Sequence, residues 1–186
     1  MLIFIFSLAL LSSLLLLGLS LTSLLSNSFQ FWPPPDKTTW QYNMFWVLFR
    51  IIFGAIIILS IFDFNGLDNL LRFYLGIALT LIGLGLGFYI TFYLGWENAH
   101  GEEKGLKVSG WYAWSRNPIY TVSFIGFIGW GLAVNSIYVY VLFALLIGFY
   151  IFAPFLEEPW LEEHYGKAYL DYKKNVPRFF GWSRPK

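Results

Sequence analysis

The sequence contains no cysteine and few charged residues. Of its 186 residues, 12% are charged and 58% are hydrophobic, whereas a soluble domain carries roughly 25% charged residues. The lack of cysteine excludes a disulfide framework, a thiolate metal site and a cysteine nucleophile. The formal net charge of +1 gives no electrostatic basis for binding nucleic acid. This composition indicates a membrane protein.

Five apolar stretches stand out against the roughly 17–25 residues that an α-helix needs to cross a bilayer. The first lacks a preceding basic segment and is too long for the apolar part of a signal peptide, so we expect a retained span. The fourth and fifth are separated only by Asn135 and Ser136, which predicts a tight helical hairpin. The five stretches are Leu2–Leu25, Met44–Phe62, Phe73–Trp96, Ile119–Val134 and Ile137–Leu156.

A charged segment follows the fifth stretch. Pro159 suits the first turn of a new helix, and apolar or aromatic side chains then recur at helical spacing on one face. The expected fold class is therefore an all-α integral membrane protein with about five transmembrane helices plus a C-terminal amphipathic cytoplasmic helix. Gly166 within that helix costs about 1 kcal/mol relative to alanine, so we expect another group to approach its backbone closely. The amphipathic face comprises Leu161, Tyr165, Ala168, Tyr169 and Tyr172.

Lysine and arginine are distributed unevenly between the two sides of the predicted bundle. Ten of the twelve fall in the first loop, the third loop and the C-terminal tail, whereas the opposite side holds Arg72 alone and Arg50 lies inside the second span. Because lysine and arginine mark cytoplasmic loops, the sequence predicts a multi-pass protein with its C-terminus in the cytoplasm and its N-terminus outside.

The chain divides near residue 97 into two regions of one structural unit. Residues 1–96 form an N-terminal three-helix membrane region, and residues 97–186 form a C-terminal region with a loop, the hairpin and the amphipathic helix. Gly83 and Gly87 make a GxxxG pair typical of a close-packing helix face. Arg50 admits two interpretations: it snorkels or pairs with an acidic residue such as Asp63, or it meets an anion within the bundle.

Charged and aromatic residues should gather where the hairpin begins and ends. Arg116 precedes the fourth span, and Glu157 and Glu158 close the fifth, so both ends reach the same interface. A guanidinium can grip a carboxylate, a carboxylate can take an ammonium or ribose hydroxyls, and aromatic faces attract cations. The combination suits a zwitterionic ligand with an aromatic base; the alternative is an aromatic membrane-interface belt with snorkelling charges. The surrounding aromatics are Trp111, Tyr112, Trp114, Tyr120, Trp160, Tyr165 and Tyr169.

Metal and phosphate chemistry have weaker support. The two histidines, His100 and His164, do not lie in a metal-ligand pattern. The sequence also lacks a GxSxG nucleophile elbow and a phosphate-binding loop. We therefore predict no metal site.

The last ninety or so residues resemble the isoprenylcysteine carboxyl methyltransferase family of integral membrane enzymes. The stretch SGWYAWSRNPIY matches that family's Arg-His-Pro-x-Tyr motif, EEPWL its Glu-Glu-x-x-Leu motif, and YGKAYLDYKKNVPRF its aromatic-Gly-x-x-Tyr-x-x-Tyr-x-x-x-Val-Pro tail. Two positions depart from the pattern. Asn117 stands in place of the usual histidine, and Val122 stands in place of a small residue.

The resemblance implies a methyltransferase whose helices cradle S-adenosyl-L-methionine at their cytoplasmic end. The implied partners are the lipid bilayer and a lipophilic small-molecule or prenylcysteine-like acceptor, with no nucleic acid. Two alternatives stay open: an NADPH-dependent reductase of the sterol type, which has a similar C-terminal layout, and a non-catalytic membrane protein whose charged tail docks on anionic lipid or a partner. The expected catalytic residues are Arg116 and Glu158. The expected cofactor-binding residues are Arg116, Asn117, Pro118, Tyr120, Glu157, Glu158, Tyr165 and Tyr169.

Overall fold

The computed structural model describes residues 1–26, 29–95 and 105–181, and within these ranges every regular element is helical. The all-α class is therefore confirmed. Four helices are long and apolar enough to cross a membrane, and α6 is a shorter apolar helix of 17 residues. The elements are α1 (Leu2–Leu25), α2 (Trp40–Phe62), the 3-10 helix η1 (Gly66–Asp68), α3 (Leu70–Leu94), α5 (Trp111–Trp114), α6 (Pro118–Val134) and α7 (Ile137–Asn175).

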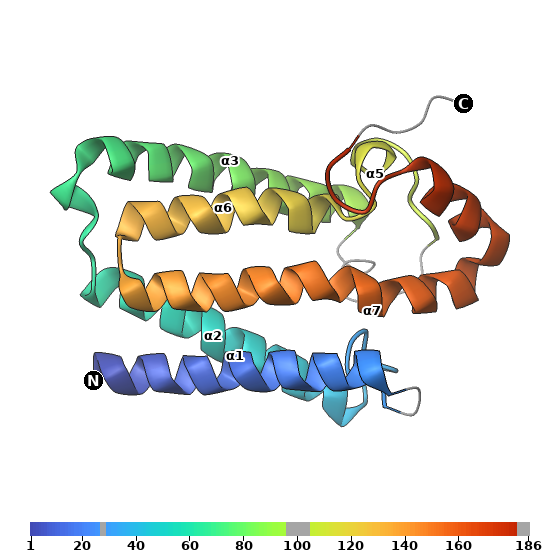
Figure 1. Ribbon diagram of the computed structural model, residues 1–186, viewed down its shortest axis with the longest axis horizontal. Helices are drawn as coiled ribbons and strands as arrows, with labels where there is room; N and C mark the ends of the chain where they lie inside the picture. Colours follow the sequence, from blue (N-terminus) through green and yellow to red (C-terminus); the bar gives the residue numbers. More distant parts are fainter. Residues whose placement is uncertain (27–28, 96–104, 182–186) are drawn as a thin grey trace.

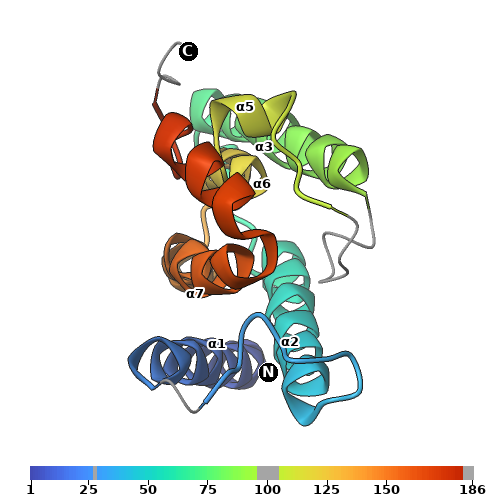
Figure 2. The ribbon, with the colours of Figure 1, turned by 90° about the vertical axis from the view of Figure 1, so that its right-hand side faces the viewer.

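The helices form three layers around α7. Figure 2 looks along the bundle and shows α7 between the α1–α2 pair on one side and the α3–α6 pair on the other. Figure 1 shows that α6 and α7 run side by side as a hairpin, with α5 and the last turns of α7 at the same end of the molecule. The N-terminal end of α6 and the later part of α7 therefore lie at the same end of the bundle, as the sequence predicts.

The hairpin turn consists of the two residues that the sequence singled out. Asn135 adopts the left-handed conformation (φ 56°) and ends α6, while its backbone N–H donates to the carbonyl of Gly131. Asparagine tolerates this conformation better than most residues. Ser136 then caps α7, because its side chain accepts a hydrogen bond from the backbone N–H of Val139.

Glycines allow α3 and α6 to pack backbone against backbone. A Cβ built on Gly83 would lie 2.2 Å from the backbone nitrogen of Gly126, and one built on Gly76 would lie 2.4 Å from that of Ala133. A Cβ on Gly87 would make an ordinary contact, 3.5 Å from Ser123 Oγ. The predicted close-packing face is thus confirmed, and it packs inside the molecule.

The course of α7 corrects the predicted start of the C-terminal helix. The helix continues through Pro159 and changes direction only at Gly166, whose φ of 52° and ψ of −127° are non-helical. The returning segment is visible in red in Figure 1. Nothing lies within 4 Å of a Cβ built on Gly166. The expected close approach to this glycine was therefore wrong, and its conformational freedom at positive φ explains the residue instead.

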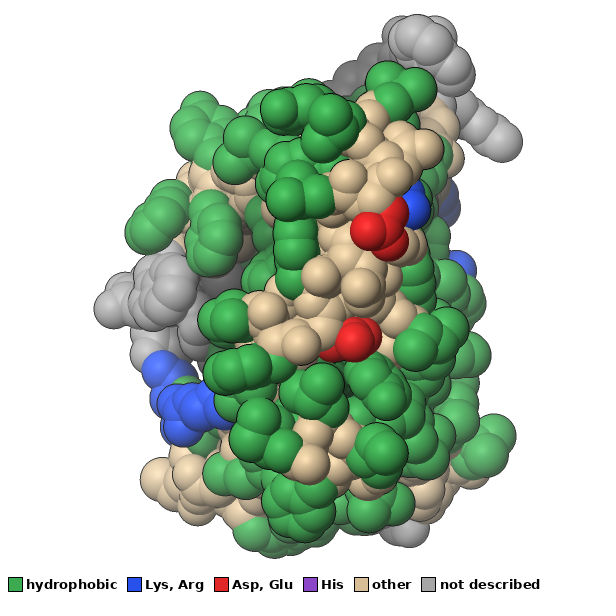
Figure 3. All heavy atoms as spheres, turned by 90° about the vertical axis from the view of Figure 1, so that its left-hand side faces the viewer, with side chains coloured by type: hydrophobic (Ala, Val, Ile, Leu, Met, Phe, Trp, Pro, Cys, Tyr) green, Lys and Arg blue, Asp and Glu red, His purple; other side chains and the backbone are tan. Residues whose placement is uncertain are grey.

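The end of the bundle opposite α5 is held by a small polar network. Ser136 Oγ donates to Asp63 Oδ2 at 2.6 Å, the backbone N–H of Asn65 donates to the carbonyl of Val134 at 2.9 Å, and Arg72 Nη2 donates to the carbonyl of Asn65 at 3.0 Å. Figure 3 shows that hydrophobic side chains cover most of this end. Arg50 is exposed on α2, and within the described ranges Asp63 bonds Ser136 rather than Arg50.

The glycine contact between α3 and α6 predicts a difference between two alanine substitutions in α3. Gly83→Ala should destabilise the protein by about 1–3 kcal/mol, because the added methyl overpacks a backbone contact. Gly85→Ala is the matched control, since nothing lies within 4 Å of its Cβ position, and it should be neutral or slightly stabilising. Thermal unfolding in detergent micelles, followed by circular dichroism, measures both. Equal stability of the two variants would contradict the packing described above.

Candidate functional site

A cavity of about 960 Å³ opens at the α5 end of the bundle. Its walls come from the connector before α2 (residues 29–39), from α2 and α3, from the turn before α6, and from the later part of α7. Six of the eight predicted cofactor residues line it: Arg116, Asn117, Tyr120, Glu157, Tyr165 and Tyr169. Pro118 and Glu158 are not among the residues that line the cavity. Pro118 is the first residue of α6, where its fixed φ suits a helix start.

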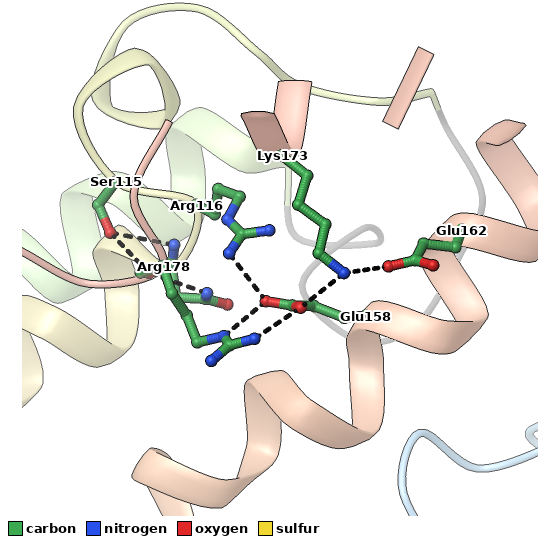
Figure 4. Close-up of polar contacts among 7 residues, drawn as sticks. Ser115, Arg116, Glu158, Glu162, Lys173 and Arg178 are labelled. Atoms are coloured by element: carbon green, nitrogen blue, oxygen red, sulfur yellow. Dashed lines mark hydrogen bonds and ion pairs between the residues drawn. The ribbon is translucent and has the colours of Figure 1, made fainter. Parts of the chain in front are cut away.

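Glu158 is buried and receives three cations (Figure 4). Arg178 makes a two-pronged contact, with Nε 2.7 Å from Oε1 and Nη2 2.9 Å from Oε2. Arg116 Nη2 lies 3.2 Å from Oε1, and Lys173 Nζ lies 3.4 Å from Oε2 and also contacts Glu162. The hydrogen bond to Glu158 raises the pKa of the Arg178 guanidinium above its ordinary value. The Glu158 carboxylate is thus paired with cations of the protein itself.

The turn that presents Arg116 is tied to the C-terminal tail. The backbone N–H of Arg116 donates to the carbonyl of Pro177 at 2.9 Å. The carbonyl of Arg178 accepts from Ser115 Oγ at 3.2 Å and from Asn117 Nδ2 at 3.0 Å (Figure 4). The asparagine that replaces the usual histidine therefore acts as a side-chain donor to the tail, a role that a histidine N–H could also fill.

Arg116 lines the cavity and carries guanidinium nitrogens without a hydrogen-bond partner in the described chain. Its side chain is 8% exposed, and in the part of the chain that the structure describes, Nε and Nη1 are buried without a hydrogen-bond partner. A buried donor left unsatisfied costs about 1–3 kcal/mol, more for a charged group.

Glu157 differs from its neighbour in its partners. Its Oε1 accepts hydrogen bonds from Trp32 Nε1 at 2.7 Å and from the Tyr120 hydroxyl at 2.5 Å. Both donors are neutral, and across residues 1–26, 29–95 and 105–181 no lysine, arginine or histidine pairs with this carboxylate. Glu157 therefore lines the cavity and has no cationic partner in the described protein.

Tyrosines on the returning segment of α7 shape the wall beside Arg116. Tyr169 is fully buried, and the Tyr172 hydroxyl donates to the carbonyl of Tyr112 at 2.6 Å. Farther along the wall, His164 stacks on Trp160 with ring centroids 4.1 Å apart. His100 lies outside the described residues. The cavity therefore has a polar end with Arg116 and Glu157, enclosed by aromatic rings.

Three residues of the site were missed by the sequence reasoning. Trp32, Lys173 and Arg178 each contact one of the two adjacent glutamates. Arg178 follows the Val-Pro pair of the tail motif, so its position offered a signal. Trp32 lies in a region without any shared motif, and nothing local in the sequence pointed to it.

The sequence was compared with models of known protein families. The sequence model of the phospholipid methyltransferase family matches residues 71–168, just over half of the chain. The chain belongs to the phospholipid methyltransferase family. This family falls within the integral membrane methyltransferase group that includes isoprenylcysteine carboxyl methyltransferase-like proteins. The resemblance found in the sequence is thereby confirmed at the level of the group, and the protein is a membrane methyltransferase.

The matched region has a clear place in the fold. The residues matched by the phospholipid methyltransferase family model include α3, α5, α6 and most of α7. Helices α1 and α2 and the connector between them lie outside the matched residues. Arg116, Glu157 and Glu158 fall inside the matched region, and Trp32 and Arg178 fall outside. No curated protein and no solved structure matches the chain.

The contact between Arg178 and Glu158 predicts a stability difference within the tail. Arg178→Ala should destabilise the protein by about 1.5–3 kcal/mol, because it removes charge-assisted hydrogen bonds to a buried carboxylate. Lys174→Ala is the control, since Lys174 is 75% exposed in a surface pair with Asp171, and such pairs contribute about 0–1 kcal/mol. Unfolding midpoints in detergent measure the difference, and a loss in the Lys174 variant as large as in the Arg178 variant would contradict it.

Proposed function

We propose that the protein is an S-adenosyl-L-methionine-dependent membrane methyltransferase that acts on a lipophilic acceptor. The observation that carries the proposal is that Arg116 and Glu157 line the same cavity. Two nitrogens of the Arg116 guanidinium have no hydrogen-bond partner, and the Glu157 carboxylate has no cationic partner in the described chain. The methionine part of the cofactor is a zwitterion. Arg116 complements its carboxylate, and Glu157 complements its ammonium.

The aromatic walls support the same ligand. Tyr120, Tyr165 and Tyr169 line the cavity beside the two charged residues. Aromatic faces attract cations and stack on planar rings, so they suit both a sulfonium and an adenine base. When bound, the cofactor supplies a methyl group activated by its sulfonium.

Glu158 has a different role from Arg116 in this proposal. Arg116 contacts the cofactor, whereas Glu158 lies behind the cavity wall and positions the Arg116 guanidinium through an ion pair of 3.2 Å. Asn117 holds the turn to the tail. The polar end of the site is therefore built from one ligand-binding arginine and a set of residues that fix its direction.

The apolar end of the cavity suits an acceptor that comes from the bilayer. There the lining passes from α2, with Trp46 and Phe49, to α3, with Phe88 and Leu94. The two helices lie on opposite sides of α7 (Figure 2). A lipophilic molecule that enters sideways between them would place a terminal carboxylate, thiol or amine near Arg116 and Glu157. An enclosed, poorly hydrated site favours transfer to such a group when positioning is good.

The cofactor end is proposed to face the cytoplasm. The segments at this end carry basic residues, among them Lys37, Lys107, Lys173 and Arg178. Lysine and arginine mark cytoplasmic loops. A soluble cofactor and a lipid-borne acceptor would then reach the cavity by separate routes. Family membership favours this chemistry over an NADPH-dependent reduction.

The first functional test is cofactor binding. Isothermal calorimetry in detergent should show micromolar binding of S-adenosylhomocysteine and no binding of NADPH. Arg116→Ala should weaken the affinity by roughly ten- to a hundredfold, since a charge-assisted hydrogen bond contributes about 1.5–3 kcal/mol. Lys167→Ala is the control, because Lys167 is exposed and outside the cavity lining. Binding of NADPH instead of S-adenosylhomocysteine would point to a reductase, and binding of neither to a non-catalytic protein.

The second functional test concerns the acceptor. Purified protein with S-adenosyl-L-methionine labelled in its methyl group should transfer label to a lipophilic acceptor with a terminal carboxylate, thiol or amine. A farnesyl-cysteine analogue is the first trial, followed by amine-bearing lipids in micelles. Extraction into organic solvent and counting measures the transfer. Labelling of a fully water-soluble acceptor, with none of any lipophilic one, would contradict the proposed route from the bilayer.

A further inference from the structure

Trp32 connects the N-terminal part of the chain to the polar end of the cavity. It lies in the connector before α2, outside the region matched by the family model. Its indole N–H donates to Glu157 Oε1 at 2.7 Å, a contact between residues 125 positions apart in the sequence. Trp32 lines the cavity and bonds to a carboxylate of the predicted site.

The surrounding rings fix the direction of this N–H group. The Trp32 indole stacks on Phe45 with ring centroids 4.0 Å apart and planes 23° apart, and it meets the edge of Phe149 at 6.5 Å. Phe45 and Phe149 are themselves buried, at 4% and 2% exposed. The preceding Phe31 is fully buried, and its backbone N–H donates to Ser23 Oγ at 2.6 Å. The connector is thus anchored directly before Trp32, and the ring contacts with Phe45 and Phe149 hold the indole N–H toward Glu157.

We propose that Trp32 is a positioning residue of the cofactor site, which orients the Glu157 carboxylate so that one of its oxygens is left for a cationic group of the ligand. The proposal rests on the proposed function. Both described hydrogen bonds to Glu157, from Trp32 and from Tyr120, are made to the same oxygen, Oε1. Two fixed donors on one oxygen define the rotation of the carboxylate and leave Oε2 as the acceptor for a ligand.

The two adjacent glutamates show why this arrangement suits a ligand rather than the fold alone. Glu158 meets its desolvation cost with cations of the protein. Glu157 meets part of it with two neutral hydrogen-bond donors. A carboxylate removed from water without a cation is costly, and a ligand ammonium would supply the missing partner.

A double-mutant cycle separates a positioning role from simple packing. Trp32→Phe keeps an aromatic ring for the stack on Phe45 but removes the donor. We expect it to weaken binding of S-adenosylhomocysteine about tenfold, the range for loss of a hydrogen bond to a charged group. Glu157→Gln should weaken binding by at least as much. In the Glu157→Gln background, Trp32→Phe should add less than about a twofold effect, because residues that act through one another are not additive.

Trp40→Phe is the matched control for the same chemical change. Trp40 begins α2, is 53% exposed and does not line the cavity. Its variant should bind S-adenosylhomocysteine as the unmodified protein does. Unfolding midpoints of all variants, measured in the same detergent, show whether each one is folded at the temperature of the titration.

The outcomes distinguish this inference from the proposed function. If the unmodified protein does not bind S-adenosylhomocysteine, both are wrong. If it binds and Trp32→Phe binds equally well, the positioning role is wrong while the proposed function stands. If Trp32→Phe weakens binding by the same factor with and without Glu157→Gln, the indole acts through packing, which also overturns the positioning role. A tenfold loss that disappears in the Glu157→Gln background supports it.

Discussion

Three cationic side chains converge on the buried carboxylate of Glu158, and the geometry of the site depends on that convergence. Removing a carboxylate from water costs several kcal/mol, so the three cations stabilise the fold by offsetting that cost. Two of them lie on segments that would otherwise be loosely attached: Arg116 on the turn before α6 and Arg178 on the tail. Because the Arg178 carbonyl also accepts from Ser115 and Asn117, the tail and the turn fix each other. The direction of the Arg116 guanidinium follows from this closed set of bonds.

Helical geometry explains why two consecutive glutamates have separate roles. Neighbouring residues on an α-helix point about 100° apart, so Glu157 and Glu158 cannot face the same group. Glu158 turns toward the tail and its cations, and Glu157 turns toward the connector and the cavity. Two adjacent acids within α7 therefore supply a structural anchor and, in the proposed enzyme, a ligand-facing carboxylate.

The parts of the structure that could be predicted are those governed by local patterns. Bilayer-length apolar runs specify the helices, and α1 has the predicted bounds of Leu2–Leu25. A two-residue polar break predicts the hairpin, and spaced glycines predict the α3–α6 contact. The start of the last helix was misplaced at Pro159 because proline is a strong helix-start signal, whereas the chain turns where Gly166 permits positive φ. Trp32 could not be predicted, since its contact with Glu157 exists only once the connector folds over α7.

The division between the matched and unmatched regions corresponds to a division of labour in the proposed enzyme. The region shared with the family carries Arg116 and Glu157, the residues proposed to face the methyl donor. The unmatched α2 supplies Trp46 and Phe49 to the apolar end of the cavity, where the acceptor would lie. Such an arrangement lets acceptor preference change in the N-terminal helices without disturbing the donor site. The proposed role of Trp32 would constrain that freedom, because the connector that leads into α2 also bonds to Glu157, the carboxylate proposed to bind the methyl donor. Changes in the N-terminal region that shift the connector would therefore be expected to alter cofactor affinity together with acceptor preference.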